Sequence, residues 1–142
     1  MEKVLGERSS DVVIHLGDGA REAGQMSDAY PNREFFIVSG NCDMGVMAPD
    51  ELLIEKRGVR IFLTHGHKYS VKFGLDRLIS AAEKAGAQIL LFGHTHAQQN
   101  TYTDGLYILN PGSLAHPRDG RPSYGYIDIT PAGIFTNTVE LL

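Results

Sequence analysis

Four apolar runs along this chain end in the same way, with a glycine next to one or more polar side chains. The four endings read "HLGDG", "VSGNCD", "LTHGH" and "LFGHTH". A short apolar run that a glycine stops is typical of a buried strand that ends in a tight turn. In open α/β sheets, ligands bind outside the carboxyl ends of the strands. The repeated ending therefore predicts a sheet with several polar side chains gathered at one edge.

The front half of the sequence alternates predicted strands with helices or loops. Strands are predicted over 12–16 and 35–38, and two more are joined at Arg57–Gly58. The segment 70–86 predicts a helix, with Ser70 able to cap its start and Gly86 suited to its end. Its apolar face comprises Val71, Leu75, Leu78, Ile79 and Ala82.

The back half is predicted to be almost entirely strand. The runs "AQQNTYT", "LYILN", "YGYIDIT" and "IFTNTVELL" are separated by Asp-Gly, Pro-Gly and Pro-Ala-Gly turns, which favours antiparallel pairing. We therefore expect one α/β domain over residues 1–142, built on two packed sheets with helices outside.

The polar residues at the strand ends form a set suited to binding a metal ion. One carboxylate, one amide oxygen and three imidazoles are expected to meet there: Asp18, Asn41, His65, His94 and His96. Such mixed nitrogen and oxygen ligation suits Mn²⁺, Fe²⁺, Co²⁺, Ni²⁺ or Zn²⁺ better than Ca²⁺. In an extended chain, residues i and i+2 point to the same face, so His94 and His96 are expected to face one pocket.

The motifs "GDG", "GNCD", "THGH", "GHTH" and "NPGSLAHPR" resemble, in order, those of the calcineurin-like metallophosphoesterase superfamily, closest to its small bacterial and archaeal phosphodiesterase branch. The resemblance implies an α/β/β/α sandwich and hydrolysis of phosphodiester bonds by a metal-activated hydroxide at a two-metal site. It makes Asp18 the bridging ligand. It assigns Asn41, His65 and His94 to one ion and His96 to the other, with Mn²⁺ as the first choice of metal.

The family's opening strand, which ends in Asp-x-His, is missing from this sequence. The first residues resemble the helix that follows that strand, so the chain begins about 20 residues inside the family pattern. We expect one well-formed metal site and slower catalysis than in relatives that carry both motifs. We also expect unpaired neighbouring strands, which favour a homo-oligomer, local disorder or low stability.

Three further residues are candidates for the chemistry. Many relatives outside this branch carry a histidine at the position of Cys42, where it is thought to protonate the leaving group. A thiol with an ordinary pKa of about 8.5 is a poorer acid, so His67 is the alternative donor. Arg118 could bind the substrate phosphate with two hydrogen bonds, or form a surface salt bridge. We interpret His15 as a packed histidine, His116 as a loop residue and Asp43 as a turn-ordering carboxylate.

Composition narrows the class of partner. The net charge of −4 and the lack of a basic stripe make nucleic acid an unlikely ligand, and no apolar run is long enough to cross a membrane. The single cysteine, Cys42, favours a cytoplasmic protein.

The expected activity is therefore hydrolysis of a small phosphodiester, with phosphomonoesters or nucleic acid as other substrate classes. The alternative is a non-catalytic scaffold on the same fold, like a eukaryotic trafficking-complex subunit that resembles these enzymes and acts by binding partners.

Overall fold

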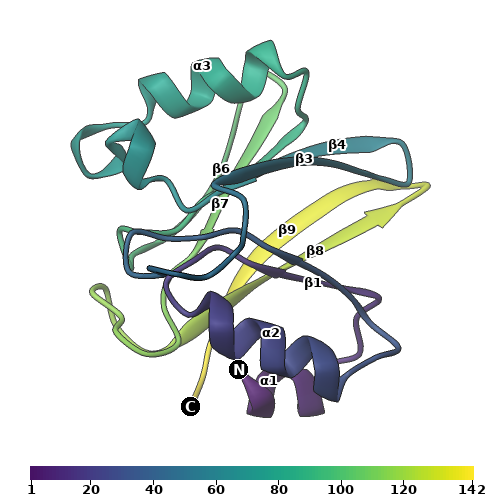
Figure 1. The fold of residues 1–142 in the computed structure, drawn as a ribbon. Helices are drawn as coiled ribbons and strands as arrows, with labels where there is room; N and C mark the ends of the chain where they lie inside the picture. The colour runs from purple at the N-terminus through teal and green to yellow at the C-terminus, as the bar shows by residue number, and fades with distance from the viewer.

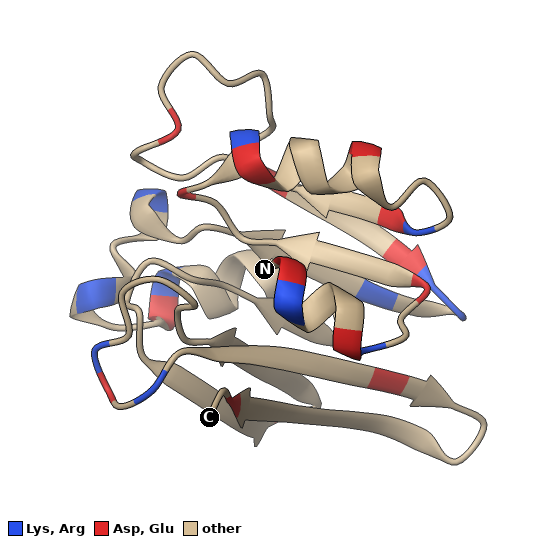
Figure 2. Ribbon diagram, turned by 90° about the horizontal axis from the view of Figure 1, so that it is seen from below, with Lys and Arg blue, Asp and Glu red and all other residues tan.

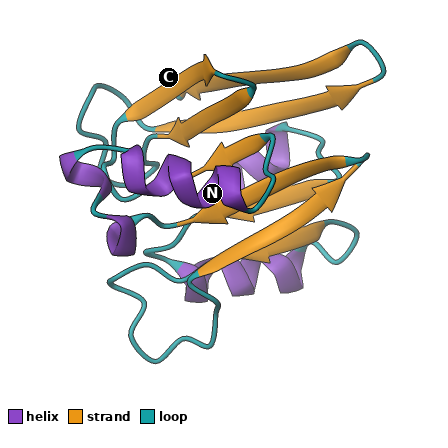
Figure 3. Ribbon diagram, turned by 90° about the horizontal axis from the view of Figure 1, so that it is seen from above, coloured by secondary structure: helices purple, strands orange, loops and turns teal.

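The computed structural model describes all 142 residues and confirms the α/β class. Three α-helices and two 3₁₀ turns are present: α1 (Glu2–Glu7), α2 (Ala20–Ala29), η1 (His67–Tyr69), η2 (Val71–Phe73) and α3 (Asp76–Lys84). Nine strands accompany them: β1 (Val12–His15), β2 (Glu34–Ile37), β3 (Glu51–Lys56), β4 (Val59–Thr64), β5 (Ile89–Leu91), β6 (Gln98–Thr103), β7 (Leu106–Pro111), β8 (Ser123–Thr130) and β9 (Gly133–Glu140). Every strand predicted from the sequence is present, and Figure 3 shows how strands dominate the chain, above all in the hairpin near the C-terminus.

One five-stranded sheet forms the larger layer, in the order β3-β4-β5-β7-β6. Its three central strands are parallel to one another, and the two edge strands run antiparallel to their neighbours. The central strands are apolar on both faces, as in "IFLT" and "ILLF", because both faces of this sheet are covered. The carboxyl ends of β4 and β5 therefore lie side by side.

The second layer is divided into two pairs of strands. β1 and β2 form a parallel pair, while β8 and β9 form an antiparallel hairpin. β1 is bonded only to β2, and β8 only to β9, so one edge of each of these two strands lacks a strand partner. The sandwich predicted from the sequence is present, and the expected unpaired strands are visible in the second layer.

Two apolar clusters hold the layers together, and consecutive residues of β5 supply both. Ile89 and Leu91 face the cluster between the sheets, whereas Leu90 and Phe92 face the cluster beneath α3. Figure 1 shows the result, with α3 on one side of the strand layers and α1 and α2 on the other. No helix is long and apolar enough to cross a membrane.

The predicted start of the long helix is wrong. α3 begins at Asp76, and the preceding residues form two 3₁₀ turns instead. Ser70 has a left-handed backbone with φ of 55° and forms no cap, and Gly74 has φ of 134°. These conformations interrupt the helix although the apolar spacing continues through Val71. The predicted end is confirmed, because Gly86 follows the last turn with φ of 70°.

Candidate metal centre

Four strands deliver side chains to one edge of the molecule, as predicted. Asp18 follows β1, Asn41 follows β2, His65 directly follows β4, and His94 lies three residues beyond β5. We call these four residues the inner group. They are far apart in sequence and meet because the carboxyl ends of their strands point in the same direction.

The ligand atoms of the inner group surround Nε2 of His65. This nitrogen lies 3.1 Å from Oδ1 of Asn41, 3.1 Å from Nδ1 of His94 and 3.2 Å from Oδ2 of Asp18. One ligand atom from each of Asp18, His65 and His94 lies within 4.8 Å of the other two. An ion about 2.0–2.2 Å from each ligand places tetrahedral ligand atoms about 3.4 Å apart, so the spacing fits a bound cation.

The fold fixes the tautomer of His65. Its Nδ1 lies 2.6 Å from the carbonyl oxygen of Leu16, which can only accept a hydrogen bond. Nδ1 therefore carries the hydrogen, and the lone pair of Nε2 points toward the other ligand atoms. Burial lowers the pKa of His65, although the bond to Leu16 opposes that shift, so the ring is neutral near pH 7.

His94 is also neutral at ordinary pH. Burial lowers its pKa to about 4, and His65, when it is protonated, and the positive charge of Lys72 act in the same direction. Because a metal displaces no proton from a neutral imidazole, this ring can bind a cation without competition from protons near neutrality.

Asp43 orders the two loops that carry Asp18 and Asn41. Its carboxylate accepts hydrogen bonds from four backbone N–H groups, those of Asp18 (2.6 Å), Gly19 (2.8 Å), Ala20 (2.9 Å) and Gly40 (2.8 Å). Burial acts to raise the pKa of Asp43, but these hydrogen bonds outweigh it and lower that pKa. The carboxylate also lies at the N-terminus of α2, where a negative charge is favourable.

Close approach of the two loops requires glycine. A Cβ atom at Gly40 would lie 2.1 Å from Oδ1 of Asp18, and one at Gly17 would lie 2.6 Å from the amide nitrogen of Gly40. Any larger residue at Gly40 would displace the proposed ligand itself.

The expected extended conformation of "GHTH" is wrong. β5 ends at Leu91, and both His94 (φ of 67°) and His96 (φ of 58°) have left-handed backbones. His96 is not among the three residues whose ligand atoms cluster, and its ring stacks on that of His116 at 6.3 Å. The backbone N–H of Arg118 donates to the carbonyl of His96 at 2.9 Å. We call His96, His116 and Arg118 the outer group.

Asn110, the first residue of the "NPGS" segment that the sequence indicated as a turn beneath the site, also holds the "GHTH" turn, a role that the sequence did not indicate. Its fully buried side chain donates to the carbonyl of Gly93 at 3.2 Å and to Oγ1 of Thr95 at 3.0 Å. A further sequence signal is that this polar residue ends the apolar run "LYILN". An amide buried there must find partners, and the turn that carries His94 supplies them.

The three candidates for proton transfer and phosphate binding lie around this centre. The ring of His67 is 5.3 Å from that of His65 and 6.1 Å from that of His94, and its Nδ1 is buried without a partner. Cys42 is exposed, and its backbone N–H donates to Oδ1 of Asp18 at 2.8 Å. The charge of Asp18 raises the pKa of the thiol, which keeps it protonated. The side chain of Arg118 is exposed.

His15 is a packed histidine, as interpreted from the sequence, and it contacts the loop that carries Asp18. Its Nδ1 accepts the N–H of Gly17 at 3.2 Å, and burial lowers its pKa.

The sequence matches the calcineurin-like phosphoesterase superfamily domain over residues 1–131. It is 34% identical over 113 residues to the probable metallophosphoesterase YsnB of Bacillus subtilis, an alignment that covers 79% of this chain. It is 36% identical over 102 residues to the phosphodiesterase YfcE of Escherichia coli, covering 64% of this chain. The matched parts span 64% of the first relative and 50% of the second.

Among solved structures, Vps29 from Entamoeba histolytica complexed with Zn²⁺ superposes with a TM-score of 0.71. That comparison covers 97% of this chain and 86% of the other at 20% identity, so it supports the fold alone. The family match over most of the sequence agrees with the sandwich and with the ligand atoms at its edge. This chain belongs to the calcineurin-like phosphoesterase superfamily.

Proposed function

We propose that the protein is a metal-dependent phosphodiesterase that acts on small substrates. The observation that carries the proposal is the convergence of Asp18, Asn41 and His94 on Nε2 of the tautomer-fixed His65. Two neutral imidazoles, a carboxylate and an amide oxygen suit Mn²⁺ or another divalent transition metal. Phosphodiesterases among the relatives support the reaction class.

The inner group would hold one ion, and Asp18 together with His96 would offer two ligands toward a second. A bound divalent ion lowers the pKa of a coordinated water and offsets charge on the phosphoryl oxygens. The protein's part is to fix the ligands, which Asp43, Asn110 and Leu16 do through the hydrogen bonds described above.

Departure of the leaving oxygen requires a proton, and His67 is the proposed donor. Its ring lies beside those of both His65 and His94, at centroid distances of 5.3 and 6.1 Å, so the side chain is within reach of a substrate held at the inner group. Cys42 is the weaker alternative, because the adjacent Asp18 raises the pKa of its thiol. Arg118 is proposed to bind a phosphoryl oxygen from the outer side.

A scaffold role is the second candidate, and two exposed methionines favour it. Met44 and Met47 are almost wholly exposed on the loop that carries Asn41, where exposed apolar groups are typical of a contact surface. The free edge of β1 supports the expected self-association of the protein, which its mass in solution would test.

Hydrolysis of bis(p-nitrophenyl) phosphate separates the two candidates. We expect turnover that depends on added Mn²⁺ and is lost in His65→Ala, with the fold checked by circular dichroism. Lys84→Ala, at an exposed lysine in the last turn of α3, is the control and should keep the activity. Absence of both metal and turnover in the folded wild-type protein would instead favour the scaffold.

A further inference from the structure

The two strand layers of the sandwich differ by one strand, although their outer strands face each other. The larger sheet has five strands, and the second layer has four, as the pairs β2-β1 and β8-β9. At one side, Lys56 at the end of β3 forms an ion pair with Glu34 at the start of β2. At the other side, Asn100 of β6 donates to the carbonyl of Thr136 of β9 at 2.9 Å and accepts from its hydroxyl at 2.8 Å. Both layers therefore span about the same width, with β1 and β8 as the inner strands of the second layer.

The difference leaves room for one strand between β1 and β8. Paired strands lie about 4.8 Å apart, so the larger sheet is about 19 Å wide from β3 to β6. Each pair of the second layer uses about 4.8 Å of that width, which leaves about 10 Å between β1 and β8, twice the spacing of paired strands. We call this space the slot. Ile14 on one side of it and Ile127 on the other pack against the same apolar cluster, so both strands lie on the same face of the larger sheet.

The two strand edges that face the slot carry backbone groups without a strand partner. Successive residues of a strand point their N–H and C=O groups to opposite edges. On β1, the carbonyl of His15 accepts a hydrogen bond from the β2 side, so Ile14 presents its groups to the slot. On β8, the carbonyl of Pro122 accepts from Leu141, and Ile127, an odd number of residues further on, faces away from β9. By the same alternation, the groups that face the slot belong to Val12, Ile14, Gly125, Ile127 and Ile129.

The strand β1 has the sequence of a central strand but the burial of an edge strand. It reads "VVIH", and consecutive apolar residues are typical of a parallel strand that is covered on both faces. The strand β5 reads "ILL", has neighbours on both sides and is buried throughout, whereas all four residues of β1 are only half-buried. Free edges are commonly protected by lysine or proline, and β1 contains neither. Its sequence therefore favours a second neighbouring strand.

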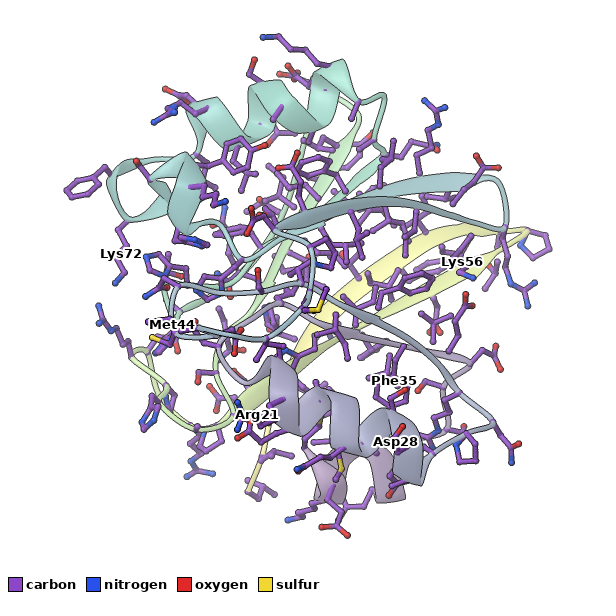
Figure 4. All side chains as sticks on the ribbon, viewed as in Figure 1. Arg21, Asp28, Phe35, Met44, Lys56 and Lys72 are labelled. Atoms are coloured by element: carbon purple, nitrogen blue, oxygen red, sulfur yellow. The ribbon has the colours of Figure 1, made fainter.

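The surroundings of the slot favour a single apolar strand. Its inner face lies on the apolar cluster between the sheets, against which Ile14 and Ile127 pack. On the outer side of this layer, Figure 4 shows Phe35 of β2 close to the helix that carries Asp28, so α2 covers that face. The side chain of Arg8, just before β1, donates to the hydroxyl of Tyr124 of β8 at 2.7 Å, which ties together the two sides of the slot.

A second copy of the folded chain does not fit into the slot. In that copy β1 already carries β2 on its other edge, so the pair is wider than the space beside β8. Pairing between the β1 strands of two copies would require the β8–β9 hairpin to move away. A single extended segment meets no such obstacle.

We propose that the slot binds one extended, apolar peptide segment of another protein, which pairs with β1 on one side and β8 on the other. Such strand addition draws affinity from main-chain hydrogen bonds and specificity from alternate side chains. The segment matches β1 in length, about four residues, and presents apolar side chains to the cluster between the sheets. The proposal depends neither on a bound metal nor on hydrolysis.

The test uses a fluorescent synthetic peptide of five alternating valine and isoleucine residues between terminal lysines, added to the metal-free full chain. A matched peptide with proline at its centre is the control, because proline lacks the N–H that a strand paired on both sides must donate. We expect one peptide bound per protein in sedimentation. Fluorescence anisotropy should give a Kd at least tenfold lower than that of the control. Hydrogen exchange should slow at least tenfold at Val12, Ile14, Ile127 and Ile129.

A variant of β8 locates the bound peptide. Ile127→Pro removes an N–H that faces the slot and leaves the bonds to β9 in place, so it should raise the peptide Kd at least tenfold. Circular dichroism checks the fold, and the exchange pattern of the wild type gives the location without any substitution. Protection at the free edge of β3 or β6 instead of the slot would overturn the proposal, as would equal affinity for the two peptides. A dimer that protects Val12 and Ile14 without peptide would also overturn it, because the occupant would then be a second copy.

Discussion

The inner and outer groups of the candidate metal centre differ in how firmly the fold holds them. His65 is buried, its tautomer is fixed by Leu16, and its Nε2 has three ligand atoms within 3.2 Å. In the outer group, His116 and Arg118 are exposed, and His96 contacts them through ring stacking and one backbone hydrogen bond. The strand ends position the inner side chains, whereas a loop alone positions His116 and Arg118.

This difference has a physical consequence for metal binding. A preorganised set of ligands binds an ion without a cost for ordering side chains, and a mobile set must be ordered first. We therefore expect the inner group to bind a divalent cation at a lower cation concentration than the outer group requires.

The largest expected effect is on the affinity for Mn²⁺, and it should differ between two histidines of the same turn. His94→Ala removes an inner ligand and should weaken Mn²⁺ binding by more than the roughly 10–100-fold that loss of a supporting residue costs. His96→Ala should weaken it less than about tenfold, because the inner group stays complete. Calorimetric titration with Mn²⁺ measures both. Equal losses in the two variants would contradict the distinction between the groups.

Asp43 offers the next test, since it holds the inner loops without being a proposed ligand. Asp43→Ala leaves four backbone N–H groups without their acceptor and should lower the free energy of unfolding by about 2–3 kcal/mol, water replacing part of what is lost. Urea unfolding at pH 7 measures the loss. Asp28→Ala, in a carboxylate of the same helix region with no hydrogen bond of its own, is the control.

Acid should remove the contribution that Asp43 makes to the stability of the folded protein. Its pKa is lowered in the folded protein, so its stabilisation is fully present above the unfolded value of about 3.9 and is lost as the pH falls through the folded value. The gap in stability between wild type and Asp43→Ala should therefore narrow only in strong acid. A gap that already closes at pH 5 would assign the stability to another group.

Much of the inner group was predictable from sequence because its signals are local. Apolar runs that end at glycine mark strand ends, and parallel strands bring such ends together. On that basis the sequence alone groups four residues, namely Asp18, Asn41, His65 and His94. The other charged residues carry no such pattern, and Figure 2 shows acidic and basic positions interspersed along the chain.

The features that sequence could not supply depend on backbone conformation or on distant partners. Left-handed φ values at Ser70, His94 and His96 are uncommon for these residue types, so neither the late start of α3 nor the compact "GHTH" turn was foreseen. The role of Asn110 depends on a turn 15 to 17 residues earlier in the chain. The apolar spacing correctly marks Val71 as a buried residue, but Val71 lies in the 3₁₀ turn η2 and not in a longer α3.

The smallest expected effect is on the pH dependence of stability, which reports how deeply His94 of the inner group is buried. The pKa of His94 is about 4 in the folded protein, below the unfolded value of about 6.5, so the unfolded chain binds the additional proton between these values. Stability of the metal-free protein should therefore fall as the pH drops from 6.5 toward 4. His94 should account for about 1 kcal/mol of the loss at pH 5 after a discount for solvent screening. Because His94→Gln lacks this titration, its urea midpoint should fall less than that of the wild type between pH 7 and pH 5. His96→Gln should follow the wild type, and identical slopes for all three proteins would mean that the inner ring is as solvated as the outer one.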